Sequence, residues 1–275
     1  MIHCGGLNFA TFYEHHPKGG YQSKEKVPTR TLIRQGLREL REEIKLWSSE
    51  WKERLECDPV IVPPAPGEVD ILWDFKNNPD FDKWVVTSDS DHKEGYSTCS
   101  LNLSPAGNAL FSGNLSIQPV KDGKTKRAGY CNMKSIRPMK SFKRDTYYDW
   151  TLYTHIVLRI RGDGRSYLLN IGTAGYFDVT WNDMFSYILF TRGGPYWQIV
   201  KIPFSKFFLA SKGRIQDKQN PLPRNRVTSV GISAGNKVNG SFRLEIDYIG
   251  LEYDPSHTEV TAYEMYRTPK FMAGY

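Results

Sequence analysis

The sequence predicts an all-β fold, a β-sandwich preceded by one long N-terminal amphipathic helix. Three observations predict it. Apolar residues recur at helical spacing over residues 28–57, and after Gly67 the apolar pattern changes from a period of about 3.6 to a period of two. The rest of the chain carries roughly ten short strand-like segments separated by turn residues, without a convincing helix between them. Its 275 residues are enough to bury a sizeable core.

The predicted helix begins at Pro28 and Thr29, after a polar, glycine-rich arm over residues 1–27, and Thr29 is a suitable N-cap. Its apolar residues recur every three or four positions and form one stripe: Ile33, Leu37, Leu40, Ile44, Trp47, Trp51 and Leu55. Three interpretations stay open: the stripe packs on its own domain, presents Trp47 and Trp51 to a partner protein, or lies on a membrane surface. The first is favoured, and the mixed charge of the polar face argues against the third.

A proline-rich linker over residues 58–69 follows the helix, and the predicted sandwich spans residues 70–254, with a tail over residues 255–275. Few crossover helices predict mainly antiparallel pairing of the strands. The predicted strands are residues 70–75, 81–87, 97–103, 109–117, 155–161, 167–173, 184–191, 196–203, 227–234 and 242–252.

Alternation is clearest in two of these strands. Over residues 155–161, the side chains of Ile156, Leu158 and Ile160 point to one face, and those of Val157, Arg159 and Arg161 point to the other. Over residues 242–248, the same rule separates an apolar set from a charged set: Phe242, Leu244, Ile246 and Tyr248 against Arg243, Glu245 and Asp247.

The chain has a formal net charge of +7, and its charge is strongly segregated. Bases dominate residues 121–144 and residues 201–226, whereas acids dominate residues 70–94. Two basic loops of this kind fit an acidic partner or a phospholipid headgroup layer. Nucleic acid is disfavoured as a partner, because the aromatic residues follow the strands and are not interleaved with the bases. No stretch approaches about 18 apolar residues, so a transmembrane helix is not predicted, and the N-terminal residues are typical neither of a secretory signal nor of an organellar presequence.

No catalytic or metal-binding pattern survives inspection, so we expect no enzyme activity, no metal and no cofactor. Residues 231–235 match G-x-S-x-G, but a hairpin loop follows where a nucleophile elbow needs a helix. The four cysteines are scattered and form no C-x-x-C pair.

Aromatic residues near turns raise a second functional class. Tyr176, Phe177 and Trp181 lie between strands, and Tyr196 and Trp197 follow a Gly-Gly-Pro turn. A β-sandwich with aromatic side chains on one face can stack against sugar rings, so a carbohydrate-binding module is the alternative function. Core packing is the favoured interpretation of these aromatic residues.

Five segments together closely resemble one known family, the complex I intermediate-associated protein 30 family. They are TRGGPYWQ at 191–198, KIPFSKF at 201–207, LRIRGDGR at 158–165, RAGYC at 127–131 and LEIDYIG at 244–250. The resemblance covers about residues 70–260 and extends to the helix before them. It implies a galactose-binding-like jelly-roll sandwich, in agreement with the period of two.

The resemblance also implies a function. Members of this family, also called NADH:ubiquinone oxidoreductase complex assembly factor one, act as chaperone-like scaffolds in the mitochondrial matrix, peripheral to the inner membrane. They hold an early membrane-arm intermediate of respiratory complex I and leave before maturity. The implied partners are complex I membrane-arm subunits, an acyl-CoA-dehydrogenase-like assembly factor, the Toll-pathway signalling intermediate protein and multispanning inner-membrane assembly proteins.

Within this picture, we expect the partner-binding residues to be arginines and tryptophans, which are enriched among interface anchors. Arg159 and Arg161 project from one face of a strand, and Arg165 follows in the next turn. Arg192 and Trp197 flank the Gly-Gly-Pro turn. Trp47 and Trp51 of the helix complete the candidate set.

Overall fold

The computed structural model describes residues 28–56, 64–76, 81–121, 123, 128–174, 183–211 and 213–263. Tyr176, Phe177 and Trp181 lie outside these residues, as do the predicted arm and half of the predicted linker. The chain divides into two compact units. The first contains the helix and a short hairpin within residues 139–146, and the second contains the two large β-sheets.

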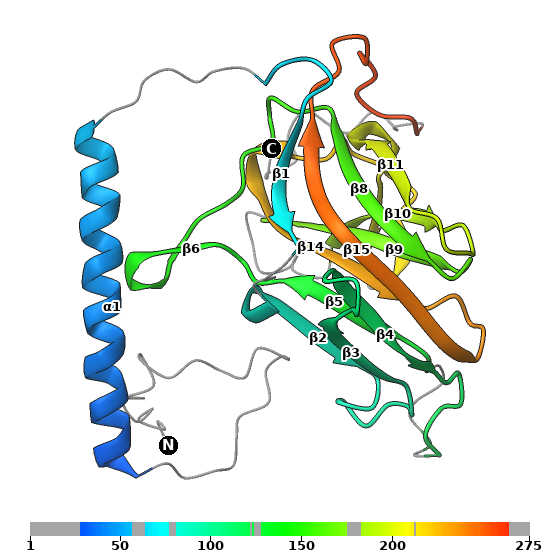
Figure 1. The fold of residues 1–275 in the computed structure, drawn as a ribbon, viewed down its shortest axis with the longest axis horizontal. Helices are drawn as coiled ribbons and strands as arrows, with labels where there is room; N and C mark the ends of the chain where they lie inside the picture. Colours follow the sequence, from blue (N-terminus) through cyan, green and yellow to red (C-terminus); the bar gives the residue numbers. More distant parts are fainter. Residues whose placement is uncertain are drawn as a thin grey trace, which may run out of the picture. The chain divides into compact units, whose positions relative to one another are not determined.

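The second unit holds a first sheet with the strand order β11-β8-β15-β4-β3, in which β1 also pairs with β15. β15, orange in Figure 1, is 13 residues long and lies between β8 on one side and β4 and β1 on the other. Its strands are β1 (Val69–Asp74), β3 (Thr98–Leu103), β4 (Ala109–Leu115), β8 (His155–Gly162), β11 (Gln198–Pro203) and β15 (Gly240–Glu252).

The second sheet has the strand order β13-β12-β10-β9-β14-β5-β2. All pairings in both sheets of the described chain are antiparallel, as predicted. Its strands are β2 (Trp84–Ser88), β5 (Cys131–Ser135), β9 (Ser166–Thr173), β10 (Asp183–Phe190), β12 (Phe208–Ser211), β13 (Arg214–Ile215) and β14 (Val227–Ala234).

One hydrophobic core forms between the inward faces of the two sheets, which confirms the predicted β-sandwich. Ile156, Leu158 and Ile160 of β8 are fully buried in it, as their alternation predicts. The alternation of β15 holds only as far as Ile246, because a β-bulge between Ile246 and Tyr248 shifts the register. After the bulge, the buried apolar residues are Ile249 and Leu251. The prediction that Tyr248 shares the face of Leu244 and Ile246 is therefore wrong.

The sequence did not predict β5, β12, β13 or the hairpin strands β6 (Met139–Lys140) and β7 (Arg144–Asp145). These segments are two to five residues long. A period of two cannot be recognised over so few residues, so their pairing depends on the neighbouring strands.

In the first unit, the β6–β7 hairpin lies beside helix α1 (Thr29–Glu56) (Figure 1). Two carboxylates of the helix bind the hairpin. Glu50 accepts hydrogen bonds from the backbone N–H and the hydroxyl of Ser141, at 2.6 and 3.1 Å, and an ion pair from Arg144. Glu43 accepts a hydrogen bond from the backbone N–H of Phe142 at 2.5 Å. Glu43 and Glu50 are seven positions apart and therefore lie on one side of the helix.

Within the first unit, the apolar stripe of α1 is exposed. The favoured interpretation, that the stripe packs on its own domain, stays a prediction. Six of its seven residues are large, exposed hydrophobic residues, and Leu40 is half-buried. Trp47 and Trp51 are 44% and 45% exposed and contact each other edge to face, with ring centroids 5.9 Å apart. The contact of α1 within its unit uses the carboxylates beside the stripe, which leaves the stripe itself uncovered.

Candidate functional site

The outer face of the first sheet carries three buried carboxylates on β15, and we call this surface the arginine–tryptophan face after the residues that cover it. Glu245 and Asp247 are each 1% exposed, and Glu252 is 4% exposed. A buried carboxylate is strongly destabilising unless a cation and hydrogen bonds compensate its charge. The neighbouring strands therefore have to supply bases.

β8 and β11 supply most of these bases, because alternate residues of a strand share a face. Arg159 forms an ion pair with Asp247, and Arg161 forms an ion pair with Glu245, its register partner on β15. Lys201 of β11 donates to Glu252 at 2.6 Å. Arg159 and Arg161 thus project together, as the sequence indicates, and both compensate buried charge.

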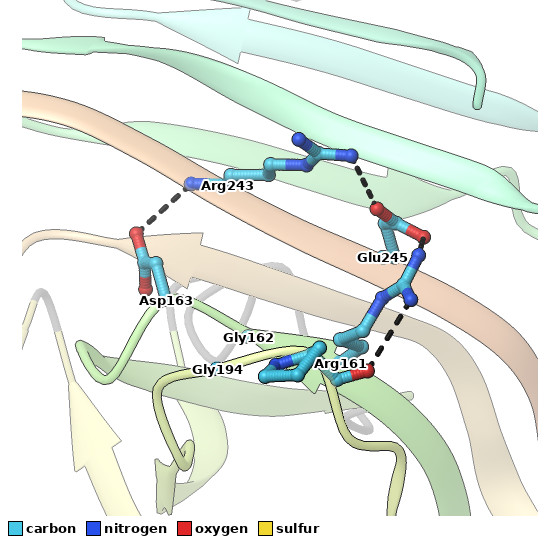
Figure 2. Close-up of a pocket in the computed structure, with 7 residues that line it drawn as sticks. Arg161, Gly162, Asp163, Gly194, Arg243 and Glu245 are labelled. Carbon is cyan, nitrogen blue, oxygen red and sulfur yellow. Dashed lines mark hydrogen bonds and ion pairs between the residues drawn. The ribbon is translucent and has the colours of Figure 1, made fainter. Parts of the chain in front are cut away.

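Two further bases complete the network. Arg243 reaches the second oxygen of Glu245 at 2.5 Å, and Lys76 lies 3.8 Å from Asp247. Glu245 and Asp247 are thereby each paired with two cations. In Figure 2 the side chains of Arg161 and Arg243 approach the carboxylate of Glu245 from different sides.

Trp197 lies against both β8 arginines. The guanidinium carbons of Arg159 and Arg161 are 5.3 and 5.0 Å from the centre of its ring, a distance at which cation–π attraction operates. The turn before Trp197 depends on Gly194, whose φ of 113° is accessible to glycine and costly for other residues. Pro195 in this turn accepts a hydrogen bond from Arg161 through its carbonyl, at 3.3 Å.

A pocket of about 300 Å³ opens beside this turn (Figure 2). Its lining joins the arginine–tryptophan face to the β8–β9 turn: Arg161, Gly162, Asp163, Gly194, Pro195, Arg243 and Glu245. Asp163 accepts hydrogen bonds from the backbone N–H of Arg243 at 2.9 Å and from the hydroxyl of Tyr167 at 3.1 Å. Burial raises the pKa of Tyr167, and Asp163 raises it further, so this hydroxyl stays a donor.

Arg165 and Arg192 differ from the two β8 arginines. Arg165 is not among the residues that line the pocket, although it lies 3.7 Å from Asp163. It donates to the loop between β14 and β15, at 2.8 Å from the carbonyl of Val238 and 3.3 Å from that of Asn239. It therefore holds a loop in place. Arg192 is exposed, and its backbone N–H is held by Gln198 at 2.7 Å. Trp47 and Trp51 belong to the first unit and are no part of this face.

Sequence reasoning missed two groups of residues here. One is the set of buried acids with Arg243, which the alternation over residues 242–248 could have indicated. The other is a pair of exposed apolar side chains near the Gly-Gly-Pro turn, Phe190 and Ile199, because exposure cannot be read from residue type. Tyr196 was named beside this turn, but it is exposed and not packed in the core as favoured. Phe190 is 71% exposed, Tyr196 is 83% exposed and Ile199 is 59% exposed.

A second polar cluster anchors the segment after β15. The hydroxyl of Ser205 lies 3.2 Å from Nε2 of His257 and 2.9 Å from the carboxylate of Glu259. A hydrolytic triad needs an exposed serine and an acid that orients the histidine. Here Ser205 is 4% exposed, and Glu259 contacts the serine instead. Elsewhere, the described residues contain no group of three or more His, Cys, Asp or Glu side chains that could hold a metal ion.

Comparison with known proteins gives concordant matches. The family model described as "Complex I intermediate-associated protein 30 (CIA30)" matches residues 73–246. A relative from Drosophila melanogaster, named "Complex I intermediate-associated protein 30, mitochondrial", is 56% identical over 275 residues, covering 99% of this chain and 92% of that protein. A relative of the same name from Mus musculus is 47% identical over 195 residues, covering 70% of this chain and 59% of that protein.

Among solved structures, a family 11 carbohydrate-binding module from Clostridium thermocellum is similar with a TM-score of 0.47 and 19% sequence identity, covering 70% of this chain and all of that one. The family model spans most of the sandwich, including the arginine–tryptophan face except Asp247 and Glu252, and the Drosophila relative matches along nearly the entire chain. The resemblance that the sequence motifs indicated is therefore confirmed, and the chain belongs to the complex I intermediate-associated protein 30 family.

Proposed function

We propose that the protein is a non-catalytic assembly factor of mitochondrial respiratory complex I. On this proposal it binds an early membrane-arm intermediate and is released before the complex is mature. The observation that carries the proposal is the 56% identity, over nearly the whole chain, to a relative whose name describes a mitochondrial protein associated with a complex I intermediate. Identity of this extent over nearly the whole chain supports carrying over the role that the relative's name describes.

The proposed docking surface is the exposed rim of the arginine–tryptophan face. Arg159 and Arg161 compensate buried carboxylates, and they act as positioning residues that hold Trp197. The side chains left for a partner are those around the turn, namely Arg192, Tyr196 and Ile199. Arginine and aromatic side chains of this kind are typical anchors of protein interfaces.

The proposed location is the mitochondrial matrix, peripheral to the inner membrane. The proposed partners are complex I membrane-arm subunits, an acyl-CoA-dehydrogenase-like assembly factor, the Toll-pathway signalling intermediate protein and multispanning inner-membrane assembly proteins. On this proposal, the protein covers apolar surfaces of complex I subunits until the neighbouring subunits bind, because exposed apolar surfaces otherwise aggregate.

Carbohydrate binding is less well supported by the geometry of this face. A sugar-stacking site needs an aromatic ring with an open face. The ring of Trp197 is instead engaged by the guanidinium groups of Arg159 and Arg161. A glycan array on which the purified protein binds a sugar would favour the carbohydrate-binding alternative.

The test uses a matched pair of double variants of the full chain. Arg192→Ala with Ile199→Ala removes two exposed side chains from the rim. Arg214→Ala with Ile215→Ala makes the same chemical change on β13, at the edge of the second sheet, where both side chains are also exposed. Each tagged variant replaces the native protein in cells and is purified from gently solubilised mitochondria for mass spectrometry.

The proposal expects the rim variant to lose most of its co-purified membrane-arm subunits at an unchanged melting temperature, and the β13 variant to keep them. Equal recovery with both variants would reject the rim as the docking surface. Absence of complex I subunits from the unmodified protein's purification would reject the assembly function itself.

A further inference from the structure

The charges of α1 are not mixed around its circumference but sorted into two sides. At about 100° per residue, the apolar stripe covers about 80° of the helix, and six bases fill the next 80° or so on one side of it. They are Arg30, Arg34, Arg38, Arg41, Lys45 and Lys52. Five of the six glutamates lie on the remaining side, away from these bases: Glu39, Glu42, Glu43, Glu50 and Glu53. The exceptions are at the C-terminal end of the helix, where Glu56 lies among the bases and Arg54 lies on the acidic side. The mixed charge of the polar face was the argument against a membrane-surface helix. That argument does not apply here, because the residues that border the stripe on this side are bases.

The hairpin occupies part of the acidic side. Glu43 and Glu50 accept the hydrogen bonds of Phe142 and Ser141, and Arg144 compensates the charge of Glu50. The exposed bases on the opposite border are only partly engaged, in ion pairs of Lys45 with Glu42 and of Lys52 with Glu56 on the helix surface. Exposed pairs of this kind contribute little free energy and exchange readily for other anions. The bases beside the stripe are thus available to an external anionic surface.

The stripe itself offers a continuous apolar surface along the 28-residue helix, about 42 Å at about 1.5 Å per residue. Ile33, Leu37, Ile44 and Leu55 are between 48% and 80% exposed, and the two tryptophans lie among them. Tryptophan is enriched where a membrane meets water. None of the helices in the described part of the chain has the length and hydrophobicity of a membrane span.

We propose that α1 is a membrane-docking helix that lies in the plane of an anionic bilayer, with its apolar stripe in the interface and its basic border on the lipid headgroups. An anionic bilayer surface matches both the apolar stripe and the basic border. Its acyl region is apolar and would contact the stripe, and its headgroups are negatively charged and would contact the bases. The hairpin adds to the same character, since Met139 and Phe142 are each 50% exposed and Lys140 and Lys143 lie beside them. This inference goes beyond the assembly function and does not rest on the rim of the arginine–tryptophan face.

The experiment measures sedimentation of the full chain with vesicles of phosphatidylcholine alone and with vesicles that also contain cardiolipin. The expected result is binding to the cardiolipin vesicles and little binding to the neutral ones. Replacing three bases of the border, Arg34→Gln, Arg38→Gln and Arg41→Gln, should weaken binding about 100-fold, because each base near an anionic surface contributes about fivefold. Trp47→Gln with Trp51→Gln should weaken it by about tenfold or more through lost apolar burial.

The matched control replaces three exposed bases of the sandwich, Arg214→Gln, Lys218→Gln and Lys237→Gln, which gives the same net charge. Circular dichroism checks that each helix variant keeps its helix. The inference is overturned if the unmodified chain does not bind cardiolipin vesicles, or if the sandwich variant loses as much binding as the border variant. It is also overturned if the tryptophan variant binds vesicles normally but loses its protein partners, since the stripe would then be a protein-docking surface.

Discussion

Truncation of Arg159 to alanine tests whether the arginine–tryptophan face is built around buried charge. The substitution leaves Asp247, which is 1% exposed, with the more distant Lys76 as its ion-pair partner, at 3.8 Å. It also removes one of the two guanidinium groups that lie against Trp197. The protein should therefore lose stability although no core side chain has changed.

The magnitude follows from three contributions. Removing one partner of a buried ion pair costs about 3–5 kcal/mol. The side chain of Arg159 is 35% exposed and Lys76 remains, so the loss should be at the lower end of that range or below it. Loss of the cation–π contact adds about 0.5–1 kcal/mol. We expect the free energy of unfolding to fall by about 2–4 kcal/mol, which corresponds to a melting temperature lower by roughly 6–12 °C for a domain of this size.

The assay is urea unfolding of the full chain, followed by tryptophan fluorescence, with a second substitution as an internal check. Asp247→Asn removes the buried charge, so it should restore much of the stability that Arg159→Ala loses. Arg192→Ala is the control, because its side chain is exposed, and it should cost less than about 0.5 kcal/mol. The reasoning is refuted if Arg159→Ala is as mild as Arg192→Ala, or if Asp247→Asn gives no rescue. For the same reason, charge reversal of Arg159 and Arg161 does not test docking alone, since it would also destabilise the sandwich.

Three other predictions concern separate contacts. The pKa of Glu50 lies below its ordinary value of 4.5, chiefly because the backbone N–H of Ser141 donates to it. The hairpin contact should therefore be fully present above pH 4.5 and be lost as pH falls through the lowered pKa. Hydrogen exchange at residues 139–146 would detect this loss, and protection in Glu50→Gln equal to that of the unmodified chain would contradict the prediction. Arg165→Ala should cost about 1–3 kcal/mol and speed hydrogen exchange at residues 236–239, because the guanidinium donates to that loop; unchanged exchange there would show that the loop holds itself. Gly162→Ala should cost about 1–3 kcal/mol by overpacking, since a Cβ there would lie 2.3 Å from Thr191. Gly235→Ala meets ordinary contact at 3.7 Å and is the matched control, so equal melting temperatures of the two variants would remove the packing argument.

The sequence predicted the alternating strands well because one face of each strand is buried and the other is not. This produces a period of two in the apolar residues, which can be recognised over seven or eight neighbouring residues. His155–Gly162 and Val227–Ala234 are examples. The signal fails at the bulge after Ile246, since one extra residue reverses every later side chain, and the bulge is set by pairing with β8. It also fails for the short strands, which depend on a neighbour.

The candidate site was predicted in part. Strand alternation correctly predicted that Arg159 and Arg161 project together. It did not predict that Trp197, named separately beside the Gly-Gly-Pro turn, lies against both of them. That the two arginines compensate Asp247 and Glu245 was not, since those acids lie more than 80 residues away along the chain. Arg165 was grouped with Arg159 and Arg161 because it follows them in the chain. Its side chain instead donates to the β14–β15 loop.

The sequence by itself determined the class of fold, the long helix with its apolar stripe, and the family, because each depends on local period or on contiguous motifs. Only the tertiary structure decided which charges are buried, where the register shifts, and that the stripe of α1 is left uncovered while Glu43 and Glu50 hold the hairpin. The physical reason is that burial and ion pairing depend on residues brought together from distant parts of the chain. The residue type determines which ion pairs, hydrogen bonds or apolar contacts a side chain can form, and the fold determines whether a partner lies within reach.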